Sequence, residues 1–340
     1  SLATWEEGCC AWDAAGGIAA FDREGRLRWR ASVQGAVRAV LALQDGGVVA
    51  GGDGETVYRL DASGRKVWSQ KLVWQPMNWD NWTRMNVQVL SLASGDIDGD
   101  GNDEILAGCA DRHIYAFDDQ GKLLWRSNCQ WGPPVCMQLA RPRDGEGMQV
   151  LVGMADPAIH ACIRVYDATG TCVRTYSRPD IMSWSIPSWC RCLRVADTDS
   201  DGCDEVISGV DTNHRQLIVY GSDGEVRWDA DLGGAVLAVE AHGGCLFAGA
   251  ANGYVQCFDA VGARVWSRFL AEPVMGLAPD GAGGCRVALH GGAVVQLGAD
   301  GEVTGSSGGA AETTVAACAP QWGNGVLLVG DEDGVVRCFG

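Results

Sequence analysis

The sequence has little proline and little positive charge, and it contains no long apolar run. Its 340 residues include 10 prolines, and 26 lysines and arginines stand against 43 aspartates and glutamates, which gives a formal net charge of −17 at pH 7. No segment reaches the roughly 18 consecutive apolar residues of a transmembrane helix, so we expect no membrane span. A charge of this sign repels phosphate backbones, so we expect no nucleic-acid partner.

One short phrase recurs along the chain: an apolar run, Asp, two residues, Gly, and a second run that ends near Trp. Copies read IAAFDREGRLRW from Ile18, VYRLDASGRKVW from Val57, IYAFDDQGKLLW from Ile114 and VQCFDAVGARVW from Val255. Alternating apolar residues predict strands, and Asp-x-x-Gly predicts a hairpin turn with Gly at positive φ. Two further apolar strands precede each hairpin, so each repeat predicts four strands and no helix.

Repeated four-stranded units predict an all-β fold, a β-propeller. We predict one domain over residues 1–340 with eight blades, and a miscounted unit would leave seven. The approximate blades are 1–32, 36–72, 84–129, 133–178, 184–231, 234–270, 273–308 and 312–340. The last blade lacks its fourth strand, which we expect either the N-terminal residues 1–5 or a strand from a partner to supply.

The hairpin resembles the tryptophan-docking repeat of the pyrroloquinoline-quinone (PQQ) dehydrogenase-like propellers over nearly the whole chain. The resemblance implies the fold, and it leaves the activity open because one fold hosts many activities. The adjacent Cys9 and Cys10 are similar to the vicinal disulfide of those dehydrogenases. The chain is short for such an enzyme, however, and we place this pair in an outer strand region of the first blade. We therefore expect no PQQ.

Two loops concentrate carboxylates with the spacing of calcium sites, and both fall between the first and second strands of a blade. Acids at positions 1, 3, 5 and 9, with Gly at 6, supply the hard oxygen ligands that calcium takes. The arrangement is similar to the FG-GAP and integrin-type propeller loops. The sequence thus predicts two calcium sites, with the ligands Asp96, Asp98, Asp100 and Glu104 in one and Asp197, Asp199, Asp201 and Glu205 in the other.

Long connections between blades carry many of the tryptophans and predict a binding face. Indole rings stack on the apolar faces of sugars and on protein side chains. The candidate ligand-binding residues are Trp74, Trp79, Trp82, Trp131, Trp184 and Trp189. His113, His160 and His214 fall in the connections between second and third strands of consecutive blades, which open onto the same face, and Arg84 lies nearby. A packing role for these tryptophans, as a cap over the central channel, is the structural alternative.

These residues leave several functions open. We favour a calcium-stabilised binding or scaffold propeller, extracellular or periplasmic, with a glycan or a protein as its ligand. No secretory leader is visible in this chain, and the compartment is inferred from the weak affinity typical of external calcium sites. The alternatives are a polysaccharide lyase acting on a uronate-containing glycan, with His113, His160, His214 and Arg84 as catalytic candidates, and a subunit that self-assembles through the incomplete last blade.

The 15 cysteines divide into repeated and isolated positions. Cys257 and Cys338 occupy matching "CF" pairs, which predicts small buried apolar residues. Cys129 and Cys136 flank one loop and are the candidate disulfide.

Overall fold

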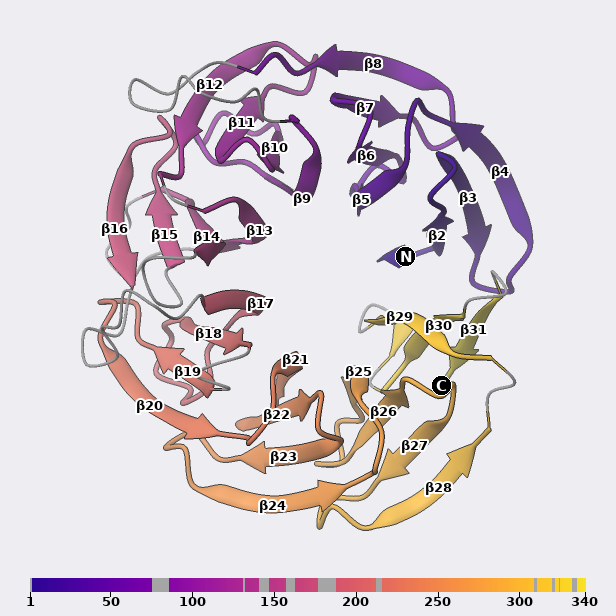
Figure 1. Ribbon diagram of the computed structural model, residues 1–340, viewed down its shortest axis with the longest axis vertical. Coiled ribbons are helices and arrows are strands. Elements are labelled where there is room, and N and C mark those ends of the chain that lie inside the picture. The colour runs from indigo at the N-terminus through magenta and orange to yellow at the C-terminus, as the bar shows by residue number, and fades with distance from the viewer. Residues whose placement is uncertain are drawn as a thin grey trace.

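The computed structural model describes residues 2–74, 86–130, 132–140, 147–156, 163–176, 188–211, 216–308, 311–319, 322–323, 325–331 and 335–340. These residues form antiparallel strands arranged as successive blades around a central axis (Figure 1). The same residues contain no α-helix, and none of them forms a helix long and apolar enough to cross a membrane. The predicted all-β propeller is therefore confirmed.

The first four blades each have four strands in sequence order from the axis outward. They are β1 (Leu2–Trp5), β2 (Gly8–Trp12), β3 (Gly17–Asp22) and β4 (Leu27–Ser32); β5 (Val37–Ala42), β6 (Val48–Gly52), β7 (Thr56–Leu60) and β8 (Lys66–Lys71); β9 (Val89–Gly95), β10 (Glu104–Cys109), β11 (His113–Phe117) and β12 (Leu123–Asn128); and β13 (Pro134–Ala140), β14 (Gln149–Asp156), β15 (Ile163–Tyr166) and β16 (Cys172–Tyr176).

The remaining units follow the same order. They are β17 (Ser188–Ala196), β18 (Glu205–Val210), β19 (Gln216–Tyr220) and β20 (Val226–Asp231); β21 (Val236–His242), β22 (Cys245–Ala250), β23 (Tyr254–Phe258) and β24 (Arg264–Phe269); β25 (Val274–Pro279), β26 (Cys285–Leu289), β27 (Val294–Leu297) and β28 (Val303–Ser307); and β29 (Thr313–Cys318), β30 (Leu327–Asp331) and β31 (Val336–Phe339). The last unit is three-stranded in the described part of the chain. The fourth and fifth units share one sheet, because Ala155 of β14 pairs with Trp189 of β17.

Burial explains why the second strand of each blade has an almost continuously apolar sequence. Each blade packs between two others, so both faces of an inner strand are covered, and every residue of β6 and β10 is buried. Outer strands face solvent, and only the third residue of β4, β8 and β24 is buried, a tryptophan each time. The buried apolar clusters lie between neighbouring blades, as the one that joins Trp68 of β8 to Phe117 of β11 illustrates.

The tryptophans of the outer strands dock on the hairpin turn of the following blade. Trp68 donates from Nε1 to the carbonyl of Asp119 over 3.0 Å. Its ring packs so closely on Gly121 that a Cβ added to this glycine would lie only 2.6 Å from the nearest ring atom. Gly121 has a φ of +81°, which a side chain would strain. This contact explains why Asp-x-x-Gly and Trp recur together in the sequence.

The ring closes between the last and first blades. Residues 2–5 form the innermost strand of the first blade, where β1 pairs with β2. The prediction that these residues complete the last blade was therefore wrong. The two-residue turn after Trp5 makes the local hairpin, which requires far less loop closure than pairing across the whole ring. Trp5 also packs into the core between the first two blades.

The cysteines are mainly core residues, and those that the structure describes are free thiols. Cys129 is fully buried and contacts the hydroxyl of Tyr166, whereas Cys136 has its sulfur 3.6 Å from that of Cys190. The structure thus does not pair Cys129 with Cys136. Cys9 and Cys10 lie in β2, the second strand from the axis, and both are buried. Their placement in an outer strand region was wrong.

Candidate functional site

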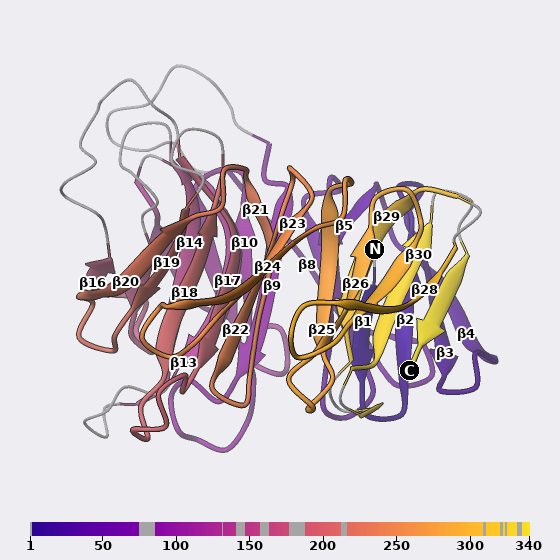
Figure 2. The same cartoon turned by 90° about the horizontal axis from the view of Figure 1, so that it is seen from below.

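The meander topology gives the propeller two distinct faces. Turns between first and second strands and between third and fourth strands open on one face, which we name the turn face. Connections between second and third strands and between successive blades open on the other, the connection face. Figure 2 shows the blades from the side, with strands running between these faces. The Asp loops follow β9 and β17 and so lie on the turn face, opposite the predicted tryptophan face.

The first Asp loop brings three carboxylates together before β10. Oxygens of Asp96, Asp98 and Glu104 lie within 4.8 Å of one another. Glu104 is buried, with 2% of its surface exposed, and it accepts a hydrogen bond from the Ile97 amide at 3.0 Å. Burial raises the pKa of Glu104, and the neighbouring Asp98 raises it further. The loop therefore presents convergent oxygens around a buried carboxyl that is costly to ionise without a cation.

The second Asp loop repeats this arrangement before β18. Oxygens of Asp197, Asp199 and Glu205 lie within 4.8 Å of one another, and Glu205 is buried. Thr198 donates to Glu205 from both its amide and its hydroxyl at 2.8 Å. In each loop the backbone amide at position 2, that of Ile97 or of Thr198, donates to the glutamate. The two loops are therefore structurally equivalent.

The fifth-position acids lie outside these convergent groups. The Asp100 carboxylate accepts from the amide of Asn102 at 2.7 Å, and that of Asp201 accepts from the amide of Cys203 at 2.9 Å. Gly101 and Gly202, at position 6, have φ near +90° and bend each loop back on itself. Three convergent carboxylates per loop, together with carbonyls and water, would meet the oxygen preference of calcium.

His113, a catalytic candidate, is a buried residue at the start of β11. Its Nδ1 lies 2.9 Å from the backbone carbonyl oxygen of Asp111, and its Nε2 lies 3.3 Å from the side-chain nitrogen Nδ2 of Asn128. Tyr115 donates to the buried carboxylate of Asp111 at 2.7 Å, and burial together with that carboxylate raises the pKa of Tyr115. Both ring nitrogens of His113 are thus engaged inside the blade.

The two candidate tryptophans that the structure describes differ in environment. Trp74 is partly buried and packs against the core between the second and third blades. Trp189, at the start of β17, is 43% exposed on the connection face. The guanidinium carbon of Arg191 lies 4.7 Å from the Trp189 ring centroid. One face of this indole is covered by a cation, a contact that restricts its rotation.

Asp211 anchors this pair, and the sequence analysis missed it. Arg191 donates to the Asp211 carboxylate from Nε at 2.6 Å and from Nη2 at 2.5 Å, and Asp211 is 1% exposed. A buried carboxylate holding an arginine fork is a strong, directional contact. The sequence repeat could have indicated Asp211. In several repeats an Asp follows the Gly of the second strand within three residues, as in Gly108 to Asp111 and Gly209 to Asp211.

The other candidates of the sequence analysis lie outside the described residues. They are Trp79, Trp82, Trp131, Trp184, His160, His214 and Arg84.

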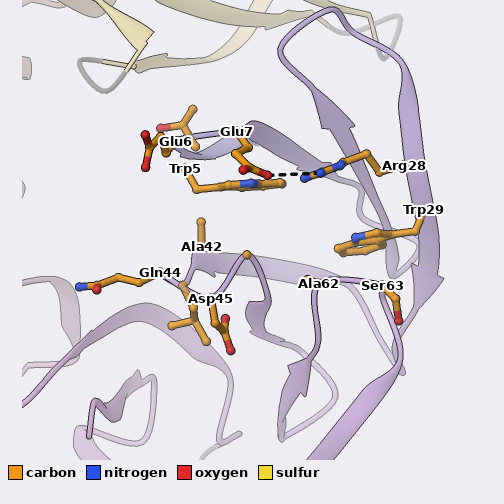
Figure 3. A pocket seen from close by; sticks show the side chains of 13 residues that line it. Trp5, Glu6, Glu7, Arg28, Trp29, Ala42, Gln44, Asp45, Ala62 and Ser63 are labelled. Carbon is orange, nitrogen blue, oxygen red and sulfur yellow. Dashed lines mark hydrogen bonds and ion pairs between the residues drawn. The ribbon is translucent and has the colours of Figure 1, made fainter. Parts of the chain in front are cut away.

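A separate pocket of about 990 Å³ lies on the turn face between the first and second blades. Figure 3 shows Trp5 and Trp29 on its walls, with Glu6, Glu7 and Asp45 around it. Arg28 and Glu7, which both line this pocket from the first blade, form an ion pair at 3.4 Å. Its indoles belong to the core between these blades, so the pocket is a surface depression in the blade packing.

Comparison with solved structures supports the same architecture. The chain matches the crystal structure of BamB from Moraxella catarrhalis with a TM-score of 0.72 and 18% identity, covering 99% of this chain and 92% of that one. It matches Sqt1 from Saccharomyces cerevisiae with a TM-score of 0.77 and 12% identity, covering 98% and 92%. It also matches the computationally designed Ika8 protein with a TM-score of 0.73 and 18% identity, covering 99% and 94%. At these identities the likeness shows the fold.

Comparison with curated protein sequences found no match. A family model described as outer membrane protein assembly factor BamB matches residues 11–166 and 201–335. This match covers most of the chain and includes the first Asp loop and most of the recurring hairpins, and it takes in the second Asp loop only from Asp201 on. The chain therefore belongs to the BamB-like family of PQQ-type β-propellers.

Proposed function

We propose that this chain is a calcium-stabilised binding propeller that holds a protein partner on its connection face. The observation that carries the proposal is the fixed indole of Trp189, which is exposed on one side and held by Arg191 on the other. Tryptophan and arginine are enriched among the residues that dominate protein interfaces. An indole that is already ordered loses little side-chain entropy when a partner covers it.

A protein partner is favoured over a glycan by the family to which the chain belongs. The family model is described as an assembly factor for outer membrane proteins, a role exercised on polypeptides. The same description supports a periplasmic location over a fully extracellular one. Negative net charge and a β-propeller scaffold suit either compartment. The proposal of a protein partner and that of a periplasmic location therefore both rest on the family description.

Calcium is proposed for the two Asp loops as a structural ion. Each loop holds a buried glutamate among aspartates that are partly or fully exposed, and a divalent cation would offset the repulsion among these carboxylates. Because the loops open on the turn face and Trp189 lies on the connection face, we assign the ions to loop stability and not to ligand contact.

The test is affinity capture with matched variants. The immobilised protein is incubated with a periplasmic extract, and captured proteins are quantified by mass spectrometry. Trp189→Ala should reduce capture of the specific partner about tenfold or more, the loss expected for an interface anchor. Val261→Ala, which truncates a 78% exposed residue in a hairpin turn on the opposite face, should leave capture unchanged.

A glycan array run on the same variants separates the two ligand classes. Two results together would contradict the proposal: the wild type and Trp189→Ala capture all proteins equally, and Trp189→Ala abolishes binding to a glycan. The ligand of the connection face would then be a glycan and not a protein.

A further inference from the structure

The turn-face pocket between the first and second blades is open because the turn beside it is short. Only Glu6 and Glu7 separate β1 from β2. The corresponding connections of the third and fifth blades are the Asp loops, which run over residues 96–103 and 197–204. The two-residue turn therefore leaves a pocket of about 990 Å³ between the turns of the first two blades (Figure 3).

The inner wall of this pocket is an indole at a position where other blades have small residues. Trp5 and Gly8 form the last pair of the β1–β2 ladder, and the residues at this point in the third, fourth and fifth blades are Gly95, Ala140 and Ala196. Trp5 is 9% exposed, and its Nε1 is buried without an acceptor among the described residues. Folded proteins rarely leave a buried donor in that state, so this nitrogen requires an explanation.

The outer wall is formed by Trp29, whose indole nitrogen also lacks an acceptor. Its ring docks on Gly64 as the other outer-strand indoles dock on their turn glycines. Three of those indoles also donate from Nε1 to a carbonyl of the turn that they cover, in the pairs Trp68–Asp119, Trp125–Ala168 and Trp228–Ala260. Within the part of the chain that the structure describes, Trp29 makes no such bond, although Ala62 occupies the equivalent place in its turn. Two indole N–H groups without a protein acceptor thus line one pocket.

Most charges around the pocket are already paired within the protein. Arg28 forms its ion pair with Glu7 at 3.4 Å, and Arg59 donates to the carboxylate of Asp45. The exposed carboxylate of Glu6 has no side-chain partner among the described residues. The pocket therefore has one free carboxylate and no large surplus of charge that would select a highly charged ligand.

The pocket offers side chains to a ligand and not a free strand edge. The turn of the second blade is closed by its own backbone, because the Leu43 amide donates to the Gly47 carbonyl at 2.9 Å and the Gly46 amide donates to the Leu43 carbonyl at 3.0 Å. An extended peptide that adds a strand needs a row of unpaired backbone groups. The polar groups that this pocket offers instead are separate donors and acceptors, such as the exposed amide of Gln44 and the carboxylate of Glu6.

We propose that this pocket binds the sugar rings of a neutral oligosaccharide. Each sugar hydroxyl both donates and accepts, so one ring would accept from the N–H of Trp29 and donate to the carboxylate of Glu6. The apolar C–H groups of the ring would contact the indoles. The volume of about 990 Å³ lies at the upper end of the roughly 300–1,000 Å³ typical of small-molecule sites, which suits a ligand of more than one ring. The site lies on the opposite face from Trp189 and is independent of the function proposed above.

A basic polypeptide is the main competing ligand, because Glu6 is free and cations bind the faces of indoles. Only 9% of Trp5 and of Trp29 is exposed, so little of either ring face is open to a cation. The edge of an aromatic ring carries partial positive charge, which attracts an acceptor and repels a cation. Arg28 lines the same pocket and would repel a second cation. A neutral ligand rich in hydroxyl groups therefore fits this pocket better.

The experiment begins with a glycan array that carries neutral, anionic and aminated glycans. The strongest neutral binder is then titrated against the protein by isothermal calorimetry, and we expect saturable binding. Glu6→Ala should weaken this binding about tenfold, because it removes a charged acceptor. Glu225→Ala is the matched control, since Glu225 is an exposed glutamate in the β19–β20 turn on the same face, and it should bind like the wild type.

Two further variants test the donors of the pocket. Trp29→Phe removes one N–H and should weaken binding about fivefold, the value of one hydrogen bond. Because Trp29 also packs in the core, the titration is run well below the melting temperature of this variant. Gln44→Ala changes an exposed residue and should also weaken binding about fivefold. Gln120→Ala, in the exposed β11–β12 turn, is its control and should bind normally.

Several results would overturn the proposal. They are the absence of binding to any neutral glycan of the array, and equal affinities of the wild type, Glu6→Ala and Trp29→Phe. Tighter binding of a hexalysine peptide than of any neutral glycan, lost in Glu6→Ala, would assign the pocket to a basic polypeptide. Glycan binding that Trp189→Ala abolishes and Glu6→Ala leaves unchanged would belong to the connection face, so failure of this site is distinguishable from failure of the function proposed above.

Discussion

The indole Nε1 of Trp322 donates a hydrogen bond of 2.6 Å to the carbonyl oxygen of Trp5, across 317 positions of sequence. Trp322 follows β29 in the last blade, and Trp5 ends β1 in the first. The guanidinium of Arg23 lies 5.9 Å from the Trp322 ring centroid. This contact ties the two ends of the ring at a seam where β31 has no outer neighbour in the described part of the chain.

Replacing Trp322 by Phe should therefore weaken ring closure. The variant keeps most of the apolar surface and loses the hydrogen bond, so we expect a loss of about 1 kcal/mol in the free energy of unfolding. Urea denaturation followed by circular dichroism measures it. Trp322→Ala should cost more, because it also removes packing against the first blade. Equal stability of Trp322→Phe and the wild type would show that this bond contributes nothing to closure.

The docking contact makes a prediction about two equivalent glycines. Gly262→Ala places a Cβ 2.5 Å from Trp228 at a φ of +83°, so it suffers both a clash and backbone strain. Gly25→Ala suffers the strain alone, about 1 kcal/mol. We expect Gly262→Ala to be less stable than Gly25→Ala by about 1 to 3 kcal/mol, the usual cost of overpacking. Thermal unfolding of both variants side by side measures the difference, and equal melting temperatures would contradict the docking role of Trp228.

The fold could be predicted from the sequence because its signals are local and repeated. Asp-x-x-Gly sets a hairpin, and the tryptophan after it marks the outer strand, so the strand pattern is legible without tertiary information. The position of residues 2–5 could not be predicted in this way, since a strand that ends in Trp5 resembles an outer strand as much as it does an inner one. These residues pair as β1 with β2 because a two-residue turn joins the two strands, and the pattern of apolar residues does not indicate how favourable such a short turn is.

The site was predictable in part for the same reason. The spacing of Asp96, Asp98 and Glu104 within one loop brings their carboxylates together, and the structure places them so. The Trp189 environment depends on Arg191 and on Asp211, which comes from a different strand connection, and no local spacing encodes that contact. His113 looked like a surface turn residue, yet its neighbours Asp111 and Asn128 draw it into the blade.

The proposed calcium sites predict a stability that depends on the ion. A ligand at 100 times its dissociation constant adds about 2.7 kcal/mol per site to the folded state, so added calcium should raise the melting temperature by several degrees. Glu104→Gln and Glu205→Gln should each remove part of that rise. Asp119→Asn, a charge change in an ordinary exposed turn, should leave it intact. A melting temperature that calcium and chelator leave unchanged would refute both sites.

The sulfur atoms of Cys136 and Cys190 predict a disulfide under oxidising conditions. They lie 3.6 Å apart on β13 and β17, the inner strands of neighbouring blades, and both rest over Gly153, which has no side chain to separate them. The hydrogen bond that the Cys136 thiol donates lowers the pKa of Cys190, which favours the thiolate that attacks in disulfide formation. We expect diamide to link this pair before any other. The closed loop spans 54 residues, and a loop of that size corresponds to a stabilisation of about 4 kcal/mol in the chain-entropy model.

Peptide mapping without reduction tests that linkage, and Cys190→Ser is its control. The oxidised wild type should yield a peptide joining Cys136 to Cys190 and a higher urea midpoint, which reduction reverses. The variant should show neither change. Cys129 lies in the same region but is fully buried, with its sulfur next to the hydroxyl of Tyr166, and burial raises its pKa to about 12. It should therefore stay reduced, and a recovered Cys129–Cys136 peptide would show that the strands at this seam rearrange on oxidation.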